Sequence, residues 1–153
     1  MQIIEVTSEN DDIQSLISIH KAFCEAVSPP EACHAVTKDA PEVSDFRYWL
    51  ARDGDQVLGC IALKQLGDHH GEVKTMHVLE SGRGKGAGKA LVQRLIDEAR
   101  KIGMTRLSLE TGTNPPFSAS RALYAQFGFA SCEPFAGYAE HPFSHFMTLA
   151  PLG

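Results

Sequence analysis

The stretch Val78-Leu79-Glu80-Ser81-Gly82-Arg83-Gly84-Lys85-Gly86-Ala87-Gly88-Lys89-Ala90-Leu91 decides how this chain is interpreted. It joins an expected strand over residues 70–78 to an amphipathic helix that runs to Ile102. Glycine lets the backbone approach a ligand closely and adopt positive φ. The free N–H groups of a helix's first turn attract anions. The stretch therefore predicts a site for a phosphate or pyrophosphate group, and the alternative is a glycine-rich turn that binds nothing.

A P-loop does not fit this stretch. That motif reads G-x-x-x-x-G-K-[ST]. If Gly88 and Lys89 supply its G-K pair, Arg83 stands where the first glycine should be, and Ala90 stands where a hydroxyl residue is needed. The P-loop interpretation therefore fails.

A dinucleotide-binding fingerprint fits only weakly. Gly82-x-Gly84-x-x-Ala87 comes close to that pattern, and Glu110 follows at about the right spacing. However, the loop lies in mid-chain after antiparallel hairpins, and only 43 residues (153 minus 110) remain to complete a doubly wound sheet.

The surrounding chain predicts one α/β domain over residues 1–153. Hydrophobic periodicity, prolines and glycines divide it into alternating strands and helices. The early strands are linked by hairpins, of which Asp53-Gly54-Asp55 is the clearest signal. Strands are expected over 2–7, 46–52, 56–66, 70–78, 105–110, 129–134 and 144–150, and helices over about 11–27, 87–102 and 118–127, with 31–45 irregular or a short helix.

Composition limits the function classes. The chain is 43% hydrophobic and 22% charged, with no apolar run near the ~20 residues that cross a bilayer. Its acidic start does not resemble a signal peptide, and its four cysteines are widely spaced, so we expect a cytoplasmic protein with reduced thiols. The net charge of -5 argues against nucleic acid as a partner. Against this acidic background four basic residues cluster and suggest a local anion site: Arg83, Lys85, Lys89 and Arg94.

The glycine stretch resembles the acetyl-CoA signature of the GNAT superfamily of acetyltransferases, V-x5-R-G-x-G-x-G-x-x-L, whose R-x-x-G-x-G core appears here as Arg83, Gly86 and Gly88. The segment 119–129 resembles that family's second motif, A-x-x-L-Y-x-x-x-G-F. The resemblance covers roughly residues 45–135. It implies a GNAT fold: a mixed, mostly antiparallel sheet of six to seven strands, with a splayed pair before and after the loop helix, and about four helices.

The resemblance also implies function. We expect an N-acetyltransferase that moves an acetyl group from acetyl-CoA directly to the amine of a small or amino-acid-like acceptor. A protein or peptide N-acetyltransferase and a catalytically silent acyl-CoA sensor are the alternatives. The residues implied in coenzyme binding are Met76, His77, Val78, Arg83, Gly84, Lys85, Gly86, Ala87, Gly88 and Lys89.

Two residues match the family's catalytic positions. Tyr124 corresponds to the tyrosine near the coenzyme sulfur, where a phenol can donate a proton to the departing thiolate. Glu72 lies six residues before Val78, where several members carry the general base, and burial could raise its pKa. The alternative for Tyr124 is an aromatic side chain that only packs on its helix, and the alternative for Glu72 is a solvent-facing glutamate at a strand end.

One position departs from the family pattern. Many members have asparagine seven residues before the tyrosine, where it bonds the coenzyme, and this chain has Phe117 there. Asn114 or Thr113 could take over that contact. The change bears on how the coenzyme arm is held, not on the pyrophosphate site.

The acceptor side is implied only by analogy. Family members build it from the segment after the first helix and from the last hairpin, which here offer Glu31, His34, Glu133 and Tyr138. The tail around Pro134, Phe135 and Tyr138 also resembles an uncharacterised bacterial GNAT subgroup. The apolar tail residues Phe143 and Phe146 are expected to be exposed and would permit a homodimer, as in many relatives.

Metal binding and covalent catalysis are not expected. The seven histidines include no H-x3-H pair, and solvated or packed histidines explain them better. Cys33 and His34 are neighbours in sequence and usually would point apart, so we expect direct transfer without an acyl-cysteine.

Overall fold

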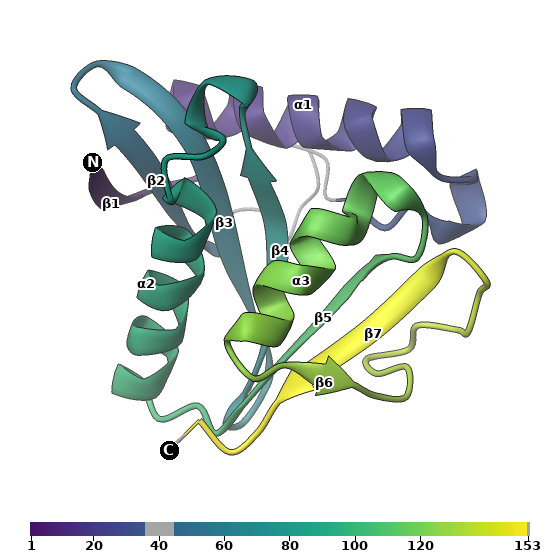
Figure 1. Cartoon of the computed structure of the whole chain (residues 1–153). Coiled ribbons are helices and arrows are strands. Elements are labelled where there is room, and N and C mark those ends of the chain that lie inside the picture. Colours follow the sequence, from purple (N-terminus) through teal and green to yellow (C-terminus); the bar gives the residue numbers. More distant parts are fainter. Residues whose placement is uncertain (36–44, 153) are drawn as a thin grey trace.

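The computed structural model describes residues 1–35 and 45–152 as a single sheet flanked by helices (Figure 1). The expected elements are present and follow the predicted order of strands and helices. The strands are β1 (Gln2–Val6), β2 (Arg47–Asp53), β3 (Gln56–Gly67), β4 (His70–Val78), β5 (Arg106–Gly112), β6 (Ala130–Ser131) and β7 (Ser144–Leu149). The helices are α1 (Asp11–Val27), α2 (Ala87–Lys101) and α3 (Ser118–Gln126), with 3-10 turns η1 (Pro30–Ala32), η3 (Glu80–Gly82) and η4 (Pro115–Phe117).

The sheet has seven strands in the order β1-β2-β3-β4-β5-β7-β6. Every neighbouring pair is antiparallel except β4 and β5, which run parallel. The crossover between those two strands contains α2, as a parallel connection requires. The predicted mixed, mostly antiparallel sheet is therefore confirmed.

Helices cover both faces of the sheet. In Figure 1, α2 and α3 lie in front of the strands and α1 runs behind them. Successive side chains of β2 point to opposite faces of the sheet and therefore contribute to the core on both faces. Trp49 packs under α2, and its neighbours Tyr48 and Leu50 pack under α1. All three side chains are fully buried. Both faces of the central strands are thus core.

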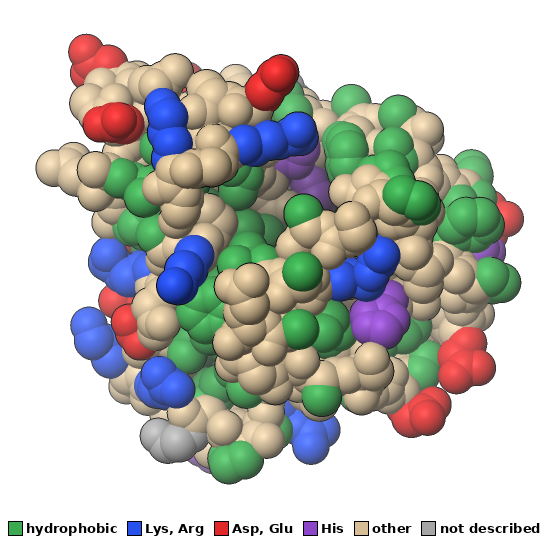
Figure 2. All heavy atoms as spheres, in the orientation of Figure 1, with side chains coloured by type: hydrophobic (Ala, Val, Ile, Leu, Met, Phe, Trp, Pro, Cys, Tyr) green, Lys and Arg blue, Asp and Glu red, His purple; other side chains and the backbone are tan. Residues whose placement is uncertain are grey.

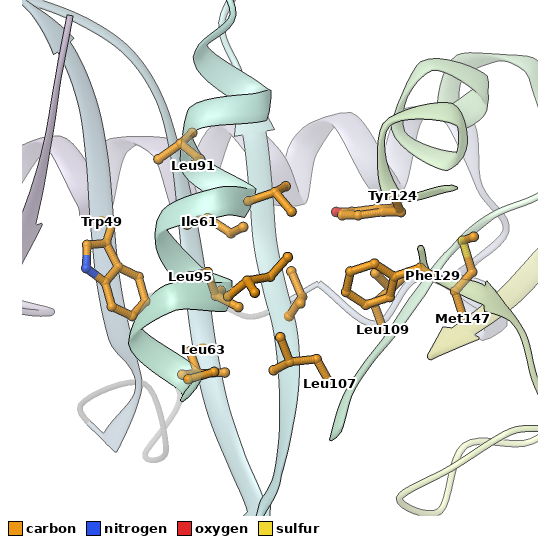
Figure 3. Packing of buried hydrophobic residues seen from close by; sticks show 14 of the residues in the cluster. Trp49, Ile61, Leu63, Leu91, Leu95, Leu107, Leu109, Tyr124, Phe129 and Met147 are labelled. Carbon is orange, nitrogen blue, oxygen red and sulfur yellow. The ribbon is translucent and has the colours of Figure 1, made fainter. Parts of the chain in front are cut away.

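Helix α2 owes its position to an apolar stripe. Leu91, Leu95 and Ala99 recur at helical spacing and are completely buried against the sheet (Figure 3). The helix ends before Gly103, whose φ of 85° gives the left-handed conformation of a helix C-terminus. The predicted C-terminal cap is confirmed.

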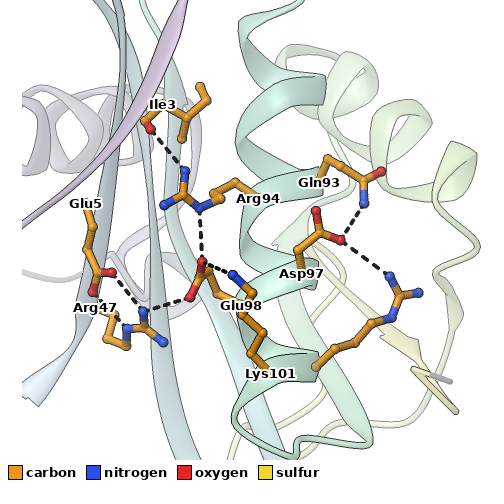
Figure 4. Close-up of polar contacts among 9 residues, drawn as sticks. Ile3, Glu5, Arg47, Gln93, Arg94, Asp97, Glu98 and Lys101 are labelled. Carbon is orange, nitrogen blue, oxygen red and sulfur yellow. Dashed lines mark hydrogen bonds and ion pairs between the residues drawn. The ribbon is translucent and has the colours of Figure 1, made fainter.

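Polar contacts lock α2 to the first two strands (Figure 4). Arg94 donates from Nη1 to the carbonyl of Ile3 at 3.1 Å and from Nε to Glu98 at 3.2 Å. Arg47 on β2 donates to the same Glu98 and to Glu5. Arg94 is therefore a structural residue, unlike the other members of the predicted basic cluster.

Strands β4 and β5 separate soon after they meet. Their pairing begins at His70 with Arg106 and ends at Glu72 with Ser108. Both strands continue beyond that point, β4 to Val78 and β5 to Gly112. The predicted splay of this strand pair is therefore present. It opens the sheet between β4 and β5.

Some details differ from the sequence-based expectations. The described residues hold three α-helices rather than about four, and part of the irregular segment expected over 31–45 lies outside the described residues. The strand expected over 129–134 shrinks to β6, because the chain leaves the sheet edge after Ser131. The expectation that Phe146 is exposed is wrong: its side chain is buried, with 5% accessible, and packs against Phe135 and Tyr138. Phe143 is exposed.

Replacing Leu95 with alanine should destabilise the protein by about 2–5 kcal/mol, because it leaves a cavity between α2 and the sheet. The measurement is the free energy of unfolding from chemical denaturation. Gln93→Ala, on the exposed side of the same helix, should change it by less than about 0.5 kcal/mol. Equal effects of the two substitutions would contradict the packing described above.

Candidate active site

A cavity of about 380 Å³ occupies the opening between β4 and β5. Its walls come from α1 and the residue that follows it, η1 and the segment after it, β4, Arg83 of the glycine-rich loop, β5, η4 and α3. Among the described residues, the edge of β4 that faces β5 has no strand partner beyond Glu72. The cavity therefore has backbone polar groups on one wall, which a bound molecule could pair with.

The predicted anion site lies where β4 passes into α2. Gly84 and Gly86 have φ angles of 74° and 79°, a conformation that other residues adopt only with strain. Gly86 precedes the first turn of α2, and no side chain caps that turn. The N–H groups at the start of α2 thus remain available to an anion.

Gly88 has a different role in the same loop. A Cβ atom here would lie 3.1 Å from the Leu123 side chain and 3.2 Å from that of Met76. The glycine therefore lets the start of α2 pack closely against β4 and α3. The loop is held next to the cavity by this close contact.

Basic side chains surround the loop. Arg83, Lys85 and Lys89 are exposed, and within the described residues none of them forms an ion pair. Arg83 also lines the cavity. Figure 2 shows Lys and Arg side chains on this face beside a hollow that contains hydrophobic side chains. The charge at the loop is thus free to bind an anion.

A bulge in β4 shapes the cavity wall. Cys60 pairs with His77 and Ala62 pairs with Lys74, so β4 has one more residue than β3 between these pairs. Thr75 has a φ of 50°, a strained conformation for a β-branched residue, and its carbonyl accepts a bond from the Cys60 thiol. Strain of this kind is common at functional sites.

Tyr124 combines packing with a place at the cavity. Its ring is 5% exposed, packs against Phe129 at 5.6 Å and belongs to the core under α3 (Figure 3). It also lines the cavity, and its hydroxyl has no hydrogen-bond partner among the described residues. Burial raises the pKa of Tyr124, so the phenol stays protonated at neutral pH.

Phe117 fills the position where many relatives have asparagine. It is 8% exposed and stacks edge-on against Phe23 of α1 at 5.4 Å. Gly112 is needed beneath it, because a Cβ there would lie 2.1 Å from the Phe117 ring. Asn114 donates its amide to the carbonyl of Val27, and its side-chain oxygen is buried without a partner within the described chain.

Glu72 belongs to a buried polar network with Tyr138 and Lys74. Its side chain is 3% exposed, and its Oε2 accepts a 2.6 Å hydrogen bond from the Tyr138 hydroxyl. Lys74 lies 3.4 Å from the same oxygen and donates to the Tyr138 oxygen at 3.0 Å. Burial and the neighbouring Glu72 carboxylate raise the pKa of Tyr138.

His34 meets a carboxylate that sequence reasoning did not select as a site residue. Its Nδ1 lies 3.2 Å from Oε1 of Glu110, a close contact rather than a well-aligned hydrogen bond. The Glu110 side chain is 11% exposed, and burial raises the pKa of its carboxyl. Glu31 does not join this group: its side chain is 65% exposed and lies 4.0 Å from His141.

A histidine pair closes the cavity on the α1 side. The Nδ1 atoms of His20 and His77 are 3.0 Å apart, and the Phe23 ring packs against His77. Burial, His77 and Lys74 lower the pKa of His20 to about 3, so this ring is neutral at physiological pH. The position of His20 in the apolar stripe of α1 is the only sequence signal for this pair.

No group of three or more histidine, cysteine, aspartate or glutamate side chains within the described residues could hold a metal ion. The four cysteines are free thiols. In the same ranges, no helix has the length and apolar character needed to cross a membrane.

Comparison with known proteins identifies the family. The acetyltransferase (GNAT) family model matches residues 13–129. The uncharacterised N-acetyltransferase YsnE of Bacillus subtilis is 44% identical over 136 residues, which cover 89% of this chain and 90% of that protein. YedL of Escherichia coli, also named an uncharacterised N-acetyltransferase, is 36% identical over 90% and 86% of the two chains. An IAA acetyltransferase of Azospirillum brasilense is 37% identical over 90% and 89%.

Solved structures agree. A putative acyl-CoA N-acyltransferase from Klebsiella pneumoniae superposes with a TM-score of 0.80 at 25% identity, over 99% of this chain and 97% of that one. An acetyltransferase of Bacillus subtilis in complex with CoA gives 0.71 at 19% identity over 97% of each chain, which shows the shared fold. With its loop, its splayed strands and these relatives, the chain belongs to the GNAT family of acetyltransferases and is an N-acetyltransferase.

Proposed function

We propose that the chain transfers an acetyl group from acetyl-CoA to the amine of a small, amino-acid-like acceptor by direct attack, in the cytoplasm. One observation carries the proposal: the uncapped, glycine-rich start of α2 lies beside the cavity between β4 and β5, since Arg83 of the same loop lines that cavity and Gly88 packs against Met76 and Leu123, which also line it. The first feature suits a diphosphate, and the second suits an extended arm with a reactive end.

The coenzyme would bind through this chain's backbone more than through its side chains. The N–H groups around Gly84, Gly86 and Gly88 would hold the pyrophosphate, with Arg83, Lys85 and Lys89 adding charge. The unpaired edge of β4 would hydrogen-bond the pantetheine arm near Met76 and Val78. Backbone N–H groups there would also polarise the thioester carbonyl.

Tyr124 is the proposed proton donor to the departing thiolate. Its hydroxyl is protonated, lies at the cavity and is free of competing partners within the described chain. Asn114 and Phe117 would border the coenzyme arm, Asn114 through its unpartnered oxygen and Phe117 through its ring. Tyr124 holds the tyrosine position of the family's second motif, whereas Phe117 stands where many members have asparagine and Asn114 lies three residues before it.

The acceptor amine would enter from the side of Glu72, Glu110 and His34. An amine attacks only as the neutral base, so a carboxylate must take up one of its protons. Glu72 is our proposed general base from the sequence, but it already accepts bonds from Tyr138 and Lys74. Glu110 is the other carboxylate at the cavity, and its raised pKa suits the same task.

Arg83→Gln should weaken acetyl-CoA binding about two- to fivefold, because an exposed ionic contact with a phosphate contributes up to about 1 kcal/mol. Titration calorimetry gives the dissociation constant. Lys101→Gln, an exposed substitution at the far end of α2, should leave it unchanged. If the wild-type protein itself shows no binding of acetyl-CoA, the proposed function is wrong.

Tyr124→Phe should reduce kcat by about 100-fold or more, with no change in acetyl-CoA affinity or melting temperature. The ring and its packing against Phe129 remain, and only the hydroxyl is lost. Release of free coenzyme thiol, measured with a panel of amines, reports kcat. An unchanged kcat would mean that Tyr124 is only a packing residue, and binding without turnover of any amine or peptide would favour a sensor.

The pH dependence of kcat/KM should identify the base. Activity requires a deprotonated carboxylate, so kcat/KM rises with pH through the pKa of that group and then levels off. Because the pKa of Glu110 is raised, a rise in kcat/KM at a pH above the usual carboxyl pKa range indicates Glu110 as the base. This pH-dependent rise should disappear in the variant that removes the base, either Glu110→Gln or Glu72→Gln. If the rise persists in one of the variants, the residue replaced there is not the base.

A further inference from the structure

Two opposite charges face each other across the opening between β4 and β5. The last pair of the parallel ladder is Glu72 with Ser108. Two residues further along each strand come Lys74 and Glu110, which point to the same face as Glu72 because side chains alternate with period two. Both line the cavity. The register therefore sets a cation on one wall opposite a carboxylate on the other.

These two charges do not neutralise each other directly. Within the described residues, no ion pair within 4.0 Å joins Lys74 to Glu110. Had the strands stayed paired, the side chains would be neighbours at about the strand spacing of ~4.8 Å. The divergence of the strands separates them, and a small molecule can lie between them.

Lys74 retains capacity to bind an anion. Its side chain is 11% exposed, and its contact with Glu72 is long, at 3.4 Å. The short bond to that carboxylate, at 2.6 Å, comes from Tyr138. Of the three N–H donors of the ammonium group, one points to Glu72 and one to Tyr138, which leaves one for a ligand.

Among the described residues, Glu110 has no cation within ion-pair distance except His34, and the more distant Lys74 only partly offsets the cost of burying its carboxylate. Its nearest partner is His34, whose Nδ1 lies 3.2 Å away. A carboxylate buried to this degree is costly without a cation beside it. A ligand ammonium group at this position would supply that cation.

Part of the remaining wall between these charges and α1 is apolar and lies beside the His20–His77 pair. Phe23 and Phe117 pack edge to face, and Ala32 and the buried Cys24 border the same cavity. Such a surface suits an apolar side chain and no further charge.

We propose that the acceptor is an amino acid with a free carboxylate and an apolar side chain, whose carboxylate binds Lys74 and whose amine binds Glu110. The proposal rests on the proposed function and narrows it from amines in general to amino acids. The Glu72–Tyr138 bond positions Lys74, and Phe23, Cys24 and Ala32 contact the acceptor side chain, while Phe117 borders the coenzyme arm. The acetyl group would arrive from the opposite end of the cavity, where Tyr124 lies.

The test compares each of three amino acids, phenylalanine, leucine and methionine, with its own amide. The amide keeps the amine and the side chain but lacks the carboxylate. We expect kcat/KM to be about 10- to 100-fold higher for the amino acids, since a hydrogen bond to a charged group contributes about 1.5–3 kcal/mol. The amide amine is the less basic of the two, so without carboxylate binding the amides would be the better acceptors.

Variants assign the effect to residues. Lys74→Met alone would leave Glu72 buried without its cation, so the double variant Glu72→Gln/Lys74→Met removes both charges. The ratio of kcat/KM for amino acid and amide should fall to one or below in the double variant, because the less basic amide is then the better acceptor, whatever happens to the absolute rates. Glu110→Gln should raise KM for both members of each pair and leave their ratio near the wild-type value.

The outcomes separate this inference from the proposed function. If the protein binds acetyl-CoA but releases thiol with no amine, amino acid or peptide, the proposed function is wrong. If it acetylates the amides as well as the amino acids, or if the double variant keeps the wild-type ratio, only the inference is overturned. Activity restricted to peptides would also overturn the inference.

Discussion

The divergence of β4 from β5 is the constraint on which the rest of the site depends. Three paired positions, from His70 to Glu72 on β4, fix the strands at one end, and beyond them the sheet opens. An opening in the middle of a sheet would normally leave backbone groups unpaired and core side chains exposed. Here the helices α1 and α3 cover it from both faces, so the opening becomes a cavity with polar edges.

Helix α2 serves the core and the site together. Its stripe of Leu91, Leu95 and Ala99 anchors it to the sheet, and Arg94 and Glu98 fix its rotation against β1 and β2. Its first turn is therefore held beside the cavity both by this packing and by the close contact of Gly88 with Met76 and Leu123. A rigid helix directed at an anion loses little on binding, because its dipoles are already oriented.

The sequence predicts the parts whose signal is local, and it misses those that depend on register. Glycine and basic residues at the start of α2, and the tyrosine of α3, lie in continuous motifs. By contrast, Lys74 and Glu110 come together only through the pairing of Glu72 with Ser108. Glu31 shows the opposite error: its place near His34 in the sequence suggested a site residue, but its side chain points to solvent near His141.

The distribution of charge within the cavity follows from the same geometry. Residues on one face of two diverging strands are neighbours at the last paired position and become separated beyond it. Glu72 lies at that last paired position, and its carboxylate accepts hydrogen bonds from Tyr138 and Lys74 of its own chain. Lys74 and Glu110 lie one step further, where the gap exceeds ion-pair distance. A buried cation and carboxylate at that separation leave a polar gap in the cavity, and the His20–His77 pair beside it adds little charge because burial lowers the pKa of both rings.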